Sequence, residues 1–131
     1  MKKGTLLNSD LSYAIASLGH TQTLTIGDAG LPVSLNVEKI DLAVTQGVPS
    51  FIEVLDAVLS EFCVEEIILA DEIVEASPEL HSKILERFPE TKLVYVQHEE
   101  FKLLSDQSIA VVRTGETTPY ANIILRSGVT F

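Results

Sequence analysis

The amino-acid sequence predicts a single α/β domain, residues 1–131, whose central sheet is largely parallel, or mixed, and is flanked by helices. Two observations predict this fold class. Apolar residues recur alternately at helical spacing and in the short runs typical of strands, and strands that alternate with helices favour right-handed crossovers and parallel pairing. Hydrophobic residues also make up 46% of the 131 residues, which is enough for the packed core of one domain.

The first part of the chain contains one predicted helix and two predicted strands. The helix begins near Ser9 or Asp10, either of which can act as N-cap, and it stops at Gly19. A short β-rich run over residues 24–26 predicts the first strand. Apolar and polar side chains alternate over residues 40–44, which predicts a second, half-buried strand.

The middle of the chain contains the clearest helix signal. Ser50 and Glu53 have the spacing of a capping box, in which the serine accepts from the third helical amide while the glutamate reaches back. Apolar residues at helical spacing continue this helix for about three turns, to Phe62. The apolar run over residues 66–70 predicts a strand that is buried on both faces.

The remaining elements continue the alternation. Ser77 and Pro78 supply an N-cap and a proline at the first helical position, and the apolar stripe of that helix extends to Phe88. A strand, a short helix and two further strands are predicted over residues 93–96, 99–104, 109–112 and 123–125.

Charge and composition exclude several classes of partner. The chain has 19 Asp and Glu against 9 Lys and Arg, a net charge of −10, whereas nucleic acids and anionic membranes are bound by clustered Lys and Arg. No apolar stretch approaches the ~18 residues of a membrane span, and the N-terminus lacks the apolar region of a signal peptide, so we expect a cytoplasmic protein. The single cysteine, Cys63, cannot form an internal disulfide or a Cys-based zinc site and is expected to be a small packing residue.

Polar residues that follow the predicted strands are the first candidates for a site. Parallel sheets bind ligands beyond the carboxyl ends of their strands, where Asp28, Asp71 and His98 lie in this sequence. His20 lies in the turn between the first helix and the first strand. Imidazole suits proton transfer near neutral pH, but an isolated histidine is more often structural, so these positions alone do not identify a reaction.

Other polar residues have simpler interpretations. His81 lies inside a predicted helix and is expected to be solvated. The carboxylates of residues 71–75 do not have the spacing of zinc or calcium ligands, which favours a solvated acidic helix start. Residues 27–30 lack the G-x-G-x-x-G pattern of a dinucleotide loop, so their glycines are expected to allow a sharp turn that leaves Asp28 exposed in a cleft.

A second concentration of polar groups lies near the C-terminus. Tyr120 offers a hydroxyl and a flat apolar face, and Asn122 offers one acceptor and two donors. Together with a carboxylate such as that of Asp28, these groups suit a neutral polyol. The alternative, a loop that satisfies its own backbone, is equally compatible with the composition.

Taken in order, these segments resemble the D-ribose pyranase family over essentially the whole chain. The matching segments are Lys2–Gly4, Leu7–Ser9, Leu18–Thr21, Asp28–Pro32, Lys39–Leu42, Gln46–Phe51, His98–Lys102, Arg113–Glu116, Pro119–Asn122 and Gly128–Phe131. The related L-fucose mutarotases share some of these elements but depart at residues 28–32 and 46–51, which favours ribose over fucose. Residues 71–92 match no motif.

The resemblance implies an isomerase that interconverts the β-pyranose and β-furanose forms of D-ribose and supplies the furanose to ribokinase, with no metal or organic cofactor. It implies that His20 is the catalytic proton donor, with Lys102 as a weaker candidate for the pocket. The sugar-binding residues that it implies are Asp28, His98, Tyr120, the Ala121 backbone and Asn122. It also implies a homo-oligomer, a decamer of two stacked pentamers with sites at subunit contacts.

The implied chemistry is acid–base catalysis of ring opening and reclosure. A proton leaves the anomeric hydroxyl, the ring oxygen is protonated, and the open aldehyde recloses through O4 in place of O5. We expect His20 to protonate the ring oxygen and Asp28 to orient it or to bind a hydroxyl, while the base is either a water or His98. Two alternatives stay open: a mutarotase for another aldose such as L-fucose, and a non-catalytic sugar-binding accessory protein of ribose uptake.

Overall fold

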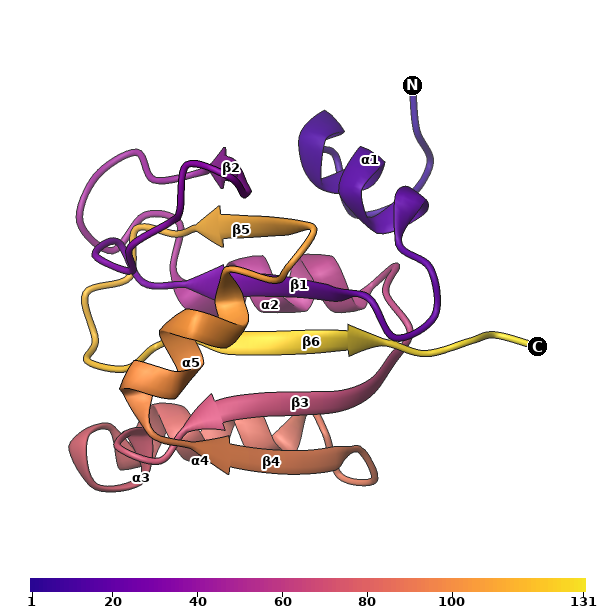
Figure 1. The fold of residues 1–131 in the computed structure, drawn as a ribbon. Helices are drawn as coiled ribbons and strands as arrows, with labels where there is room; N and C mark the ends of the chain where they lie inside the picture. Colours follow the sequence, from indigo (N-terminus) through magenta and orange to yellow (C-terminus); the bar gives the residue numbers. More distant parts are fainter.

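A six-stranded sheet forms the centre of the computed structural model, which describes residues 1–131 (Figure 1). The strands are β1 (Thr23–Gly27), β2 (Glu38–Asp41), β3 (Val64–Ala70), β4 (Lys92–Val96), β5 (Ala110–Arg113) and β6 (Ile123–Ser127). Their order in the sheet is β2-β5-β1-β6-β3-β4. Both neighbours of β6 pair with it antiparallel, and every other pair is parallel, so the predicted α/β fold with a largely parallel or mixed sheet is confirmed in its mixed form.

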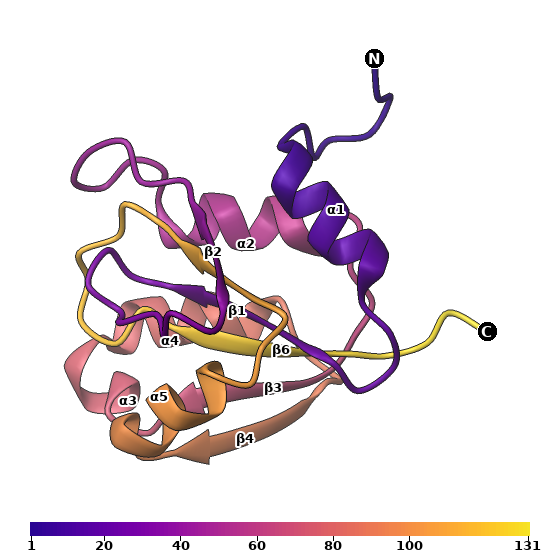
Figure 2. The same cartoon turned by 45° about the horizontal axis from the view of Figure 1, so that its top comes forward.

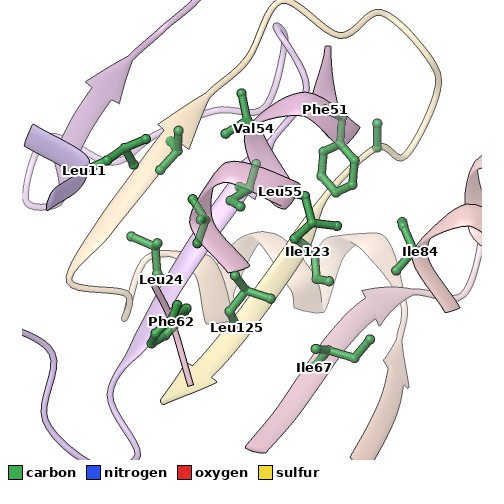
Figure 3. Close-up of a cluster of buried hydrophobic side chains, with 14 of the residues drawn as sticks. Leu11, Leu24, Phe51, Val54, Leu55, Phe62, Ile67, Ile84, Ile123 and Leu125 are labelled. Atoms are coloured by element: carbon green, nitrogen blue, oxygen red, sulfur yellow. The ribbon is translucent and has the colours of Figure 1, made fainter. Parts of the chain in front are cut away.

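Helices cover the two faces of the sheet unequally. They are α1 (Ser9–Ser17), α2 (Phe51–Leu59), α3 (Ile73–Ala76), α4 (Pro78–Glu86) and α5 (His98–Ser105). The larger core packs α1, α2 and α4 on one face, and Figure 3 shows Phe51 and Leu55 of α2 close to Ile123 and Leu125 of β6. On the opposite face α5 packs with residues 31–37 (Figure 2). No helix combines the length and the apolar character needed to cross a membrane.

The capping signals explain where α1 and α2 begin. The predicted capping box of α2 is confirmed, because the Glu53 N–H donates to Ser50 Oγ and the Ser50 N–H donates to the Glu53 carboxylate. The cap of α1 lies earlier than predicted. Asn8 Oδ1 accepts the Leu11 N–H at 2.9 Å, so Asn8 satisfies one of the free amides in the first turn of the helix.

Three side chains differ from their predictions. Ser77 precedes α4 without capping it, because its hydroxyl donates to the Pro119 carbonyl and ties α4 to that loop. Cys63 is exposed and not packed, since it lies in the turn before β3 beyond the core. His81 is half-buried and not solvated, because α4 packs against the edge strand β4 and brings His81 Nε2 to 2.5 Å from the Tyr95 hydroxyl.

Two element predictions also need correction. β2 ends at Asp41 and does not extend to Val44, which is exposed. As an edge strand it has only β5 as a neighbour, so pairing stops where β5 ends. The four-residue helix α3 was not predicted, because one helical turn is too short to show a helical period.

Glu66 is a buried carboxylate on β3 that two basic side chains neutralise. It is 8% exposed, and its oxygens lie 2.5 Å from Lys92 Nζ and 2.9 Å from Arg126 Nε. The hydrogen bond from Lys92 is the main cause that lowers the pKa of Glu66 below its ordinary value of 4.5, with the charge of Arg126 assisting and burial opposing. This ion-pair group joins β3 to both of its neighbours in the sheet.

We therefore expect Glu66 to contribute to acid unfolding. A carboxyl whose pKa is lower in the folded state stabilises the fold above its unfolded pKa, and that contribution is lost as the pH falls below 4.5 and through the folded pKa. Glu66→Gln should cost about 1–2 kcal/mol at pH 7, since Lys92 is largely solvated and Arg126 is partly solvated. Urea unfolding at pH 7 and pH 3 measures both effects. If the free energy of unfolding of Glu66→Gln fell between pH 7 and pH 3 by as much as that of the wild type, Glu66 would not contribute to acid unfolding.

Candidate active site

Asp28 and Asn122 form a fixed polar pair where β1 ends and β6 begins. Asn122 Oδ1 accepts the Asp28 N–H at 2.9 Å, and Asn122 Nδ2 donates to Asp28 Oδ2 at 2.9 Å. The other carboxylate oxygen of Asp28 accepts the Gly30 N–H at 2.8 Å. The predicted sharp turn is therefore present, but the half-buried carboxylate is held in one orientation by the protein and is not freely exposed.

Gly27 allows the backbone to approach Asn122 closely enough for this pairing. A Cβ at residue 27 would lie 2.5 Å from Leu31 Cδ2 and 3.0 Å from Asn122 Oδ1. Gly27→Ala should therefore displace Asn122 from the Asp28 N–H and lower the stability by about 1–3 kcal/mol through overpacking. Thermal unfolding and the amide NMR signal of Asp28 measure the two effects.

Gly30→Ala provides the matched control for this substitution. A Cβ at residue 30 would meet no atom closer than Asp28 Oδ1 at 3.5 Å, and the Gly30 N–H that bonds Asp28 would be kept. This variant should unfold at nearly the wild-type temperature. If both variants lost the same amount of stability, crowding at Asn122 would not be the cause of the loss in Gly27→Ala.

Tyr120 and His98 add aromatic surface next to this pair. Tyr120 has a φ of 60°, a conformation uncommon for a residue other than glycine, and the Asn122 N–H donates to its carbonyl at 2.8 Å. The Tyr120 ring meets the His98 imidazole edge-on, with ring centroids 5.1 Å apart. His98 is the first residue of α5, and its ring also stacks on Phe101 at 6.3 Å. Between Tyr120 and Asn122, Ala121 is completely buried.

Glu72 holds the helix that carries His98, and the sequence prediction missed this role. Both of its carboxylate oxygens accept the His98 N–H, at 3.0 and 3.1 Å, whereas the N-cap residue Gln97 makes no side-chain cap. His98 Nδ1 is buried and has no hydrogen-bond partner within the chain. Because buried polar atoms are nearly always paired, this nitrogen is available to a group that the chain itself does not supply.

An open depression of about 750 Å³ borders this end of the sheet. Asp71, Glu72, Glu75, Val74, Ala76, Gln97 and Tyr120 line it. The chain contains no group of three or more His, Cys, Asp or Glu side chains arranged to hold a metal ion. Lys102 is partly buried on α5 and pairs with Glu99 at 2.7 Å.

His20 lies in the tight turn that precedes β1. The Gly19 N–H donates to Gln22 Oε1 at 2.7 Å, and the Thr21 N–H donates to the carbonyl of Ser127, the last residue of β6, at 2.9 Å. The imidazole is exposed, and its Nε2 lies 2.9 Å from Glu65 Oε2. Glu65 was also missed, because nothing in the sequence links residues that lie 45 positions apart.

The structure thus separates His20 from the other predicted site residues. Asp28 and Asn122 lie at one end of the antiparallel pair β1 and β6, and His20 lies at the other end (Figure 1). Each of these strands has five residues, which corresponds to about 13 Å. One chain brings together Asp28, His98, Tyr120, Ala121 and Asn122, but it cannot bring His20 to the same small ligand.

The grouped residues have the chemistry of a site for a small neutral polar ligand. Asp28 offers an oriented carboxylate, Tyr120 a hydroxyl, and His98 a buried nitrogen without a partner. Two rings provide an apolar face of the kind that packs against carbon–hydrogen surfaces. His20 and Glu65 form a separate imidazole–carboxylate pair that is suited to proton transfer.

Comparisons with known proteins extend over the whole chain. The sequence model of the RbsD / FucU transport protein family matches residues 1–130. A D-ribose pyranase of Coprothermobacter proteolyticus is 53% identical over 131 residues, which cover all of both proteins.

Two solved structures are similar to the fold described above. The structure of Bacillus subtilis RbsD complexed with D-ribose has a TM-score of 0.97 at 46% identity, and the match covers all of both chains. The structure of the fucose mutarotase from Streptococcus pneumoniae in complex with L-fucose has a TM-score of 0.83 at 25% identity, again over the full length of both.

Proposed function

We propose that this chain, which belongs to the RbsD / FucU transport protein family, is a D-ribose pyranase that interconverts the β-pyranose and β-furanose forms of D-ribose. The observation that carries the proposal is the Asp28 carboxylate, held by Asn122 beside the rings of Tyr120 and His98, in a chain 53% identical to a D-ribose pyranase. Ribose is favoured over fucose because the relative complexed with D-ribose is 46% identical and the relative complexed with L-fucose is 25% identical.

In this proposal the sugar hydroxyls bind the polar groups at the end of β1. Asp28 accepts hydrogen bonds from hydroxyls, the Tyr120 hydroxyl and the unpartnered Nδ1 of His98 bind others, and the sugar ring packs on the aromatic surface. Asn122 is fully buried, so it acts by orienting Asp28, and the Ala121 backbone keeps Tyr120 and Asn122 in place. No metal or organic cofactor is needed for this binding.

The reaction breaks one carbon–oxygen bond and forms another, and two proton transfers accompany each of these steps. The anomeric hydroxyl loses its proton to a base, either a water or His98, the C1–O5 bond breaks, and His20 protonates the departing O5. The open aldehyde then recloses as O4 attacks C1; O4 loses its proton and the carbonyl oxygen regains one. General acid–base groups typically contribute ~10²–10⁴-fold. The furanose is the form that we expect a ribokinase in the cytoplasm to consume.

The proposal requires more than one copy of the chain. The whole of β1, about 13 Å long, lies between His20 and Asp28, which supports a site that takes His20 from one copy and the sugar-binding residues from another. We propose the decamer of two stacked pentamers that the family resemblance implies.

Exchange NMR on free sugars tests the function. Catalytic amounts of the protein should accelerate transfer of magnetisation between the pyranose and furanose signals of D-ribose, and not between the anomers of L-fucose. Acceleration for L-fucose would favour the alternative mutarotase, and binding of ribose without acceleration would favour a sugar-binding accessory protein. Sedimentation of the same sample should give ten times the mass of one chain.

A further inference from the structure

The contact between His20 and Glu65 depends on how the two backbone segments are held. The His20 Nε2 to Glu65 Oε2 distance is 2.9 Å, although the residues are 45 positions apart. Their side chains are 52% and 38% exposed, so solvent screens the attraction between them. A pair of this kind keeps one geometry only if the backbone on each side directs the side chains toward each other.

On the His20 side, the backbone adopts a conformation that its sequence disfavours. Thr21 has a φ of 70°, in the left-handed region that β-branched residues rarely adopt. The turn is held in this state because the Thr21 N–H donates to the Ser127 carbonyl at 2.9 Å and the Gln22 N–H donates to the Gly19 carbonyl at 3.2 Å. Backbone strain that the surrounding structure maintains is concentrated at functional sites.

On the other side, Glu65 is the extra residue of a β-bulge. Val64 lies opposite Ser127 and Glu66 lies opposite Arg126, so two steps along β3 match one step along β6. Bulges change the direction in which a side chain points and are common next to active sites. Here Glu66 contacts Arg126 within the sheet, while the bulged Glu65 extends to the imidazole of His20.

We propose that Glu65 is a positioning residue that orients His20 and fixes which of its nitrogens exchanges a proton with the sugar. This inference rests on the proposed function of His20. The Glu65 carboxylate can only accept, so the Nε2 facing it carries a hydrogen. Nδ1 is then the nitrogen that exchanges the proton: in the doubly protonated imidazole its N–H protonates O5, and the neutral ring that results keeps its hydrogen on Nε2, facing Glu65.

The inference is tested with Glu65→Gln, which keeps the size of the side chain and removes its charge. The rate of ribose ring exchange at saturating sugar should fall about tenfold or more, because an amide does not hold a single tautomer. The KM for ribose should change little, since Glu65 contacts His20 and is not one of the residues proposed to bind the sugar. Glu65→Asp retains the carboxylate and should keep more of the rate than Glu65→Gln.

A spectroscopic measurement separates positioning from a merely structural effect. In ¹⁵N NMR of the neutral imidazole, wild-type His20 should show the tautomer with hydrogen on Nε2, and Glu65→Gln should show a mixture of both tautomers. Glu90→Gln is the matched control. It removes the same charge from an exposed turn without an ion pair, and it should change neither the rate nor the His20 signals.

A double variant shows whether Glu65 acts through His20. In a chain that already carries His20→Ala, Glu65→Gln should cause no further loss of exchange, as expected for two residues that act as one unit. An unchanged rate and an unchanged tautomer in Glu65→Gln would overturn the inference. Absence of ribose exchange in the wild-type protein would instead overturn the proposed function, so the two failures are distinguishable.

Discussion

His20→Ala should remove nearly all acceleration of ribose ring exchange while the chain still folds. The loss should be ~10²–10⁴-fold, because that is the usual contribution of a general acid–base group. His20 is exposed in a turn whose backbone is held by Gly19, Gln22 and Ser127, so removal of the imidazole leaves the fold intact. Exchange NMR between the pyranose and furanose signals measures the rate, and circular dichroism measures the folding.

His81→Gln is the control that removes the same side chain elsewhere. His81 bonds the Tyr95 hydroxyl between α4 and β4, so this substitution should lower the unfolding temperature and leave the exchange rate unchanged. The two histidines are therefore expected to show opposite effects, one on catalysis and the other on stability. Full exchange in His20→Ala would show that His20 is not the proton donor.

Local patterns predicted most of the elements because burial and capping act over a few residues. The Ser50–Glu53 box marks the start of α2, and the apolar run that predicts β3 is buried from Ile67 to Ala70. The direction of β6 could not be predicted, since a buried apolar run looks the same in a parallel and in an antiparallel strand. The mixed sheet follows from that single strand.

The candidate site was predictable only in part, because some of its residues contact each other across long separations in the sequence. The rule that ligands bind beyond strand ends identified Asp28 and His98, and the polar groups near the C-terminus indicated Tyr120 and Asn122. The family resemblance added Ala121 and the catalytic role of His20. Glu72 and Glu65 were missed because they act across 26 and 45 positions of the chain. The predicted strand over residues 24–26 already separated His20 from Asp28 in the sequence, and the structure adds the length and the pairing of β1, which keep the two at opposite ends of one chain's sheet.

Two inactive variants should restore each other's activity, because His20 and Asp28 come from different copies in the proposed site. His20→Ala removes the proton donor, and Asp28→Ala removes the oriented carboxylate that Asn122 holds. Each variant alone should form the oligomer with every site defective. When equal amounts of the two chains are co-produced, about a quarter of the sites in a random symmetric assembly should combine an intact His20 with an intact Asp28.

The exchange rate per site of the mixed oligomer measures this recovery, with each variant purified alone as reference. A chain that carries both substitutions, mixed with the His20→Ala chain, supplies the control, because none of its sites can contain His20. If the first mixture shows only the summed residual rates of its components, each chain carries a complete site. His20 would then have to cross the length of β1, about 13 Å, to reach the sugar, which the hydrogen bond of its turn to β6 opposes.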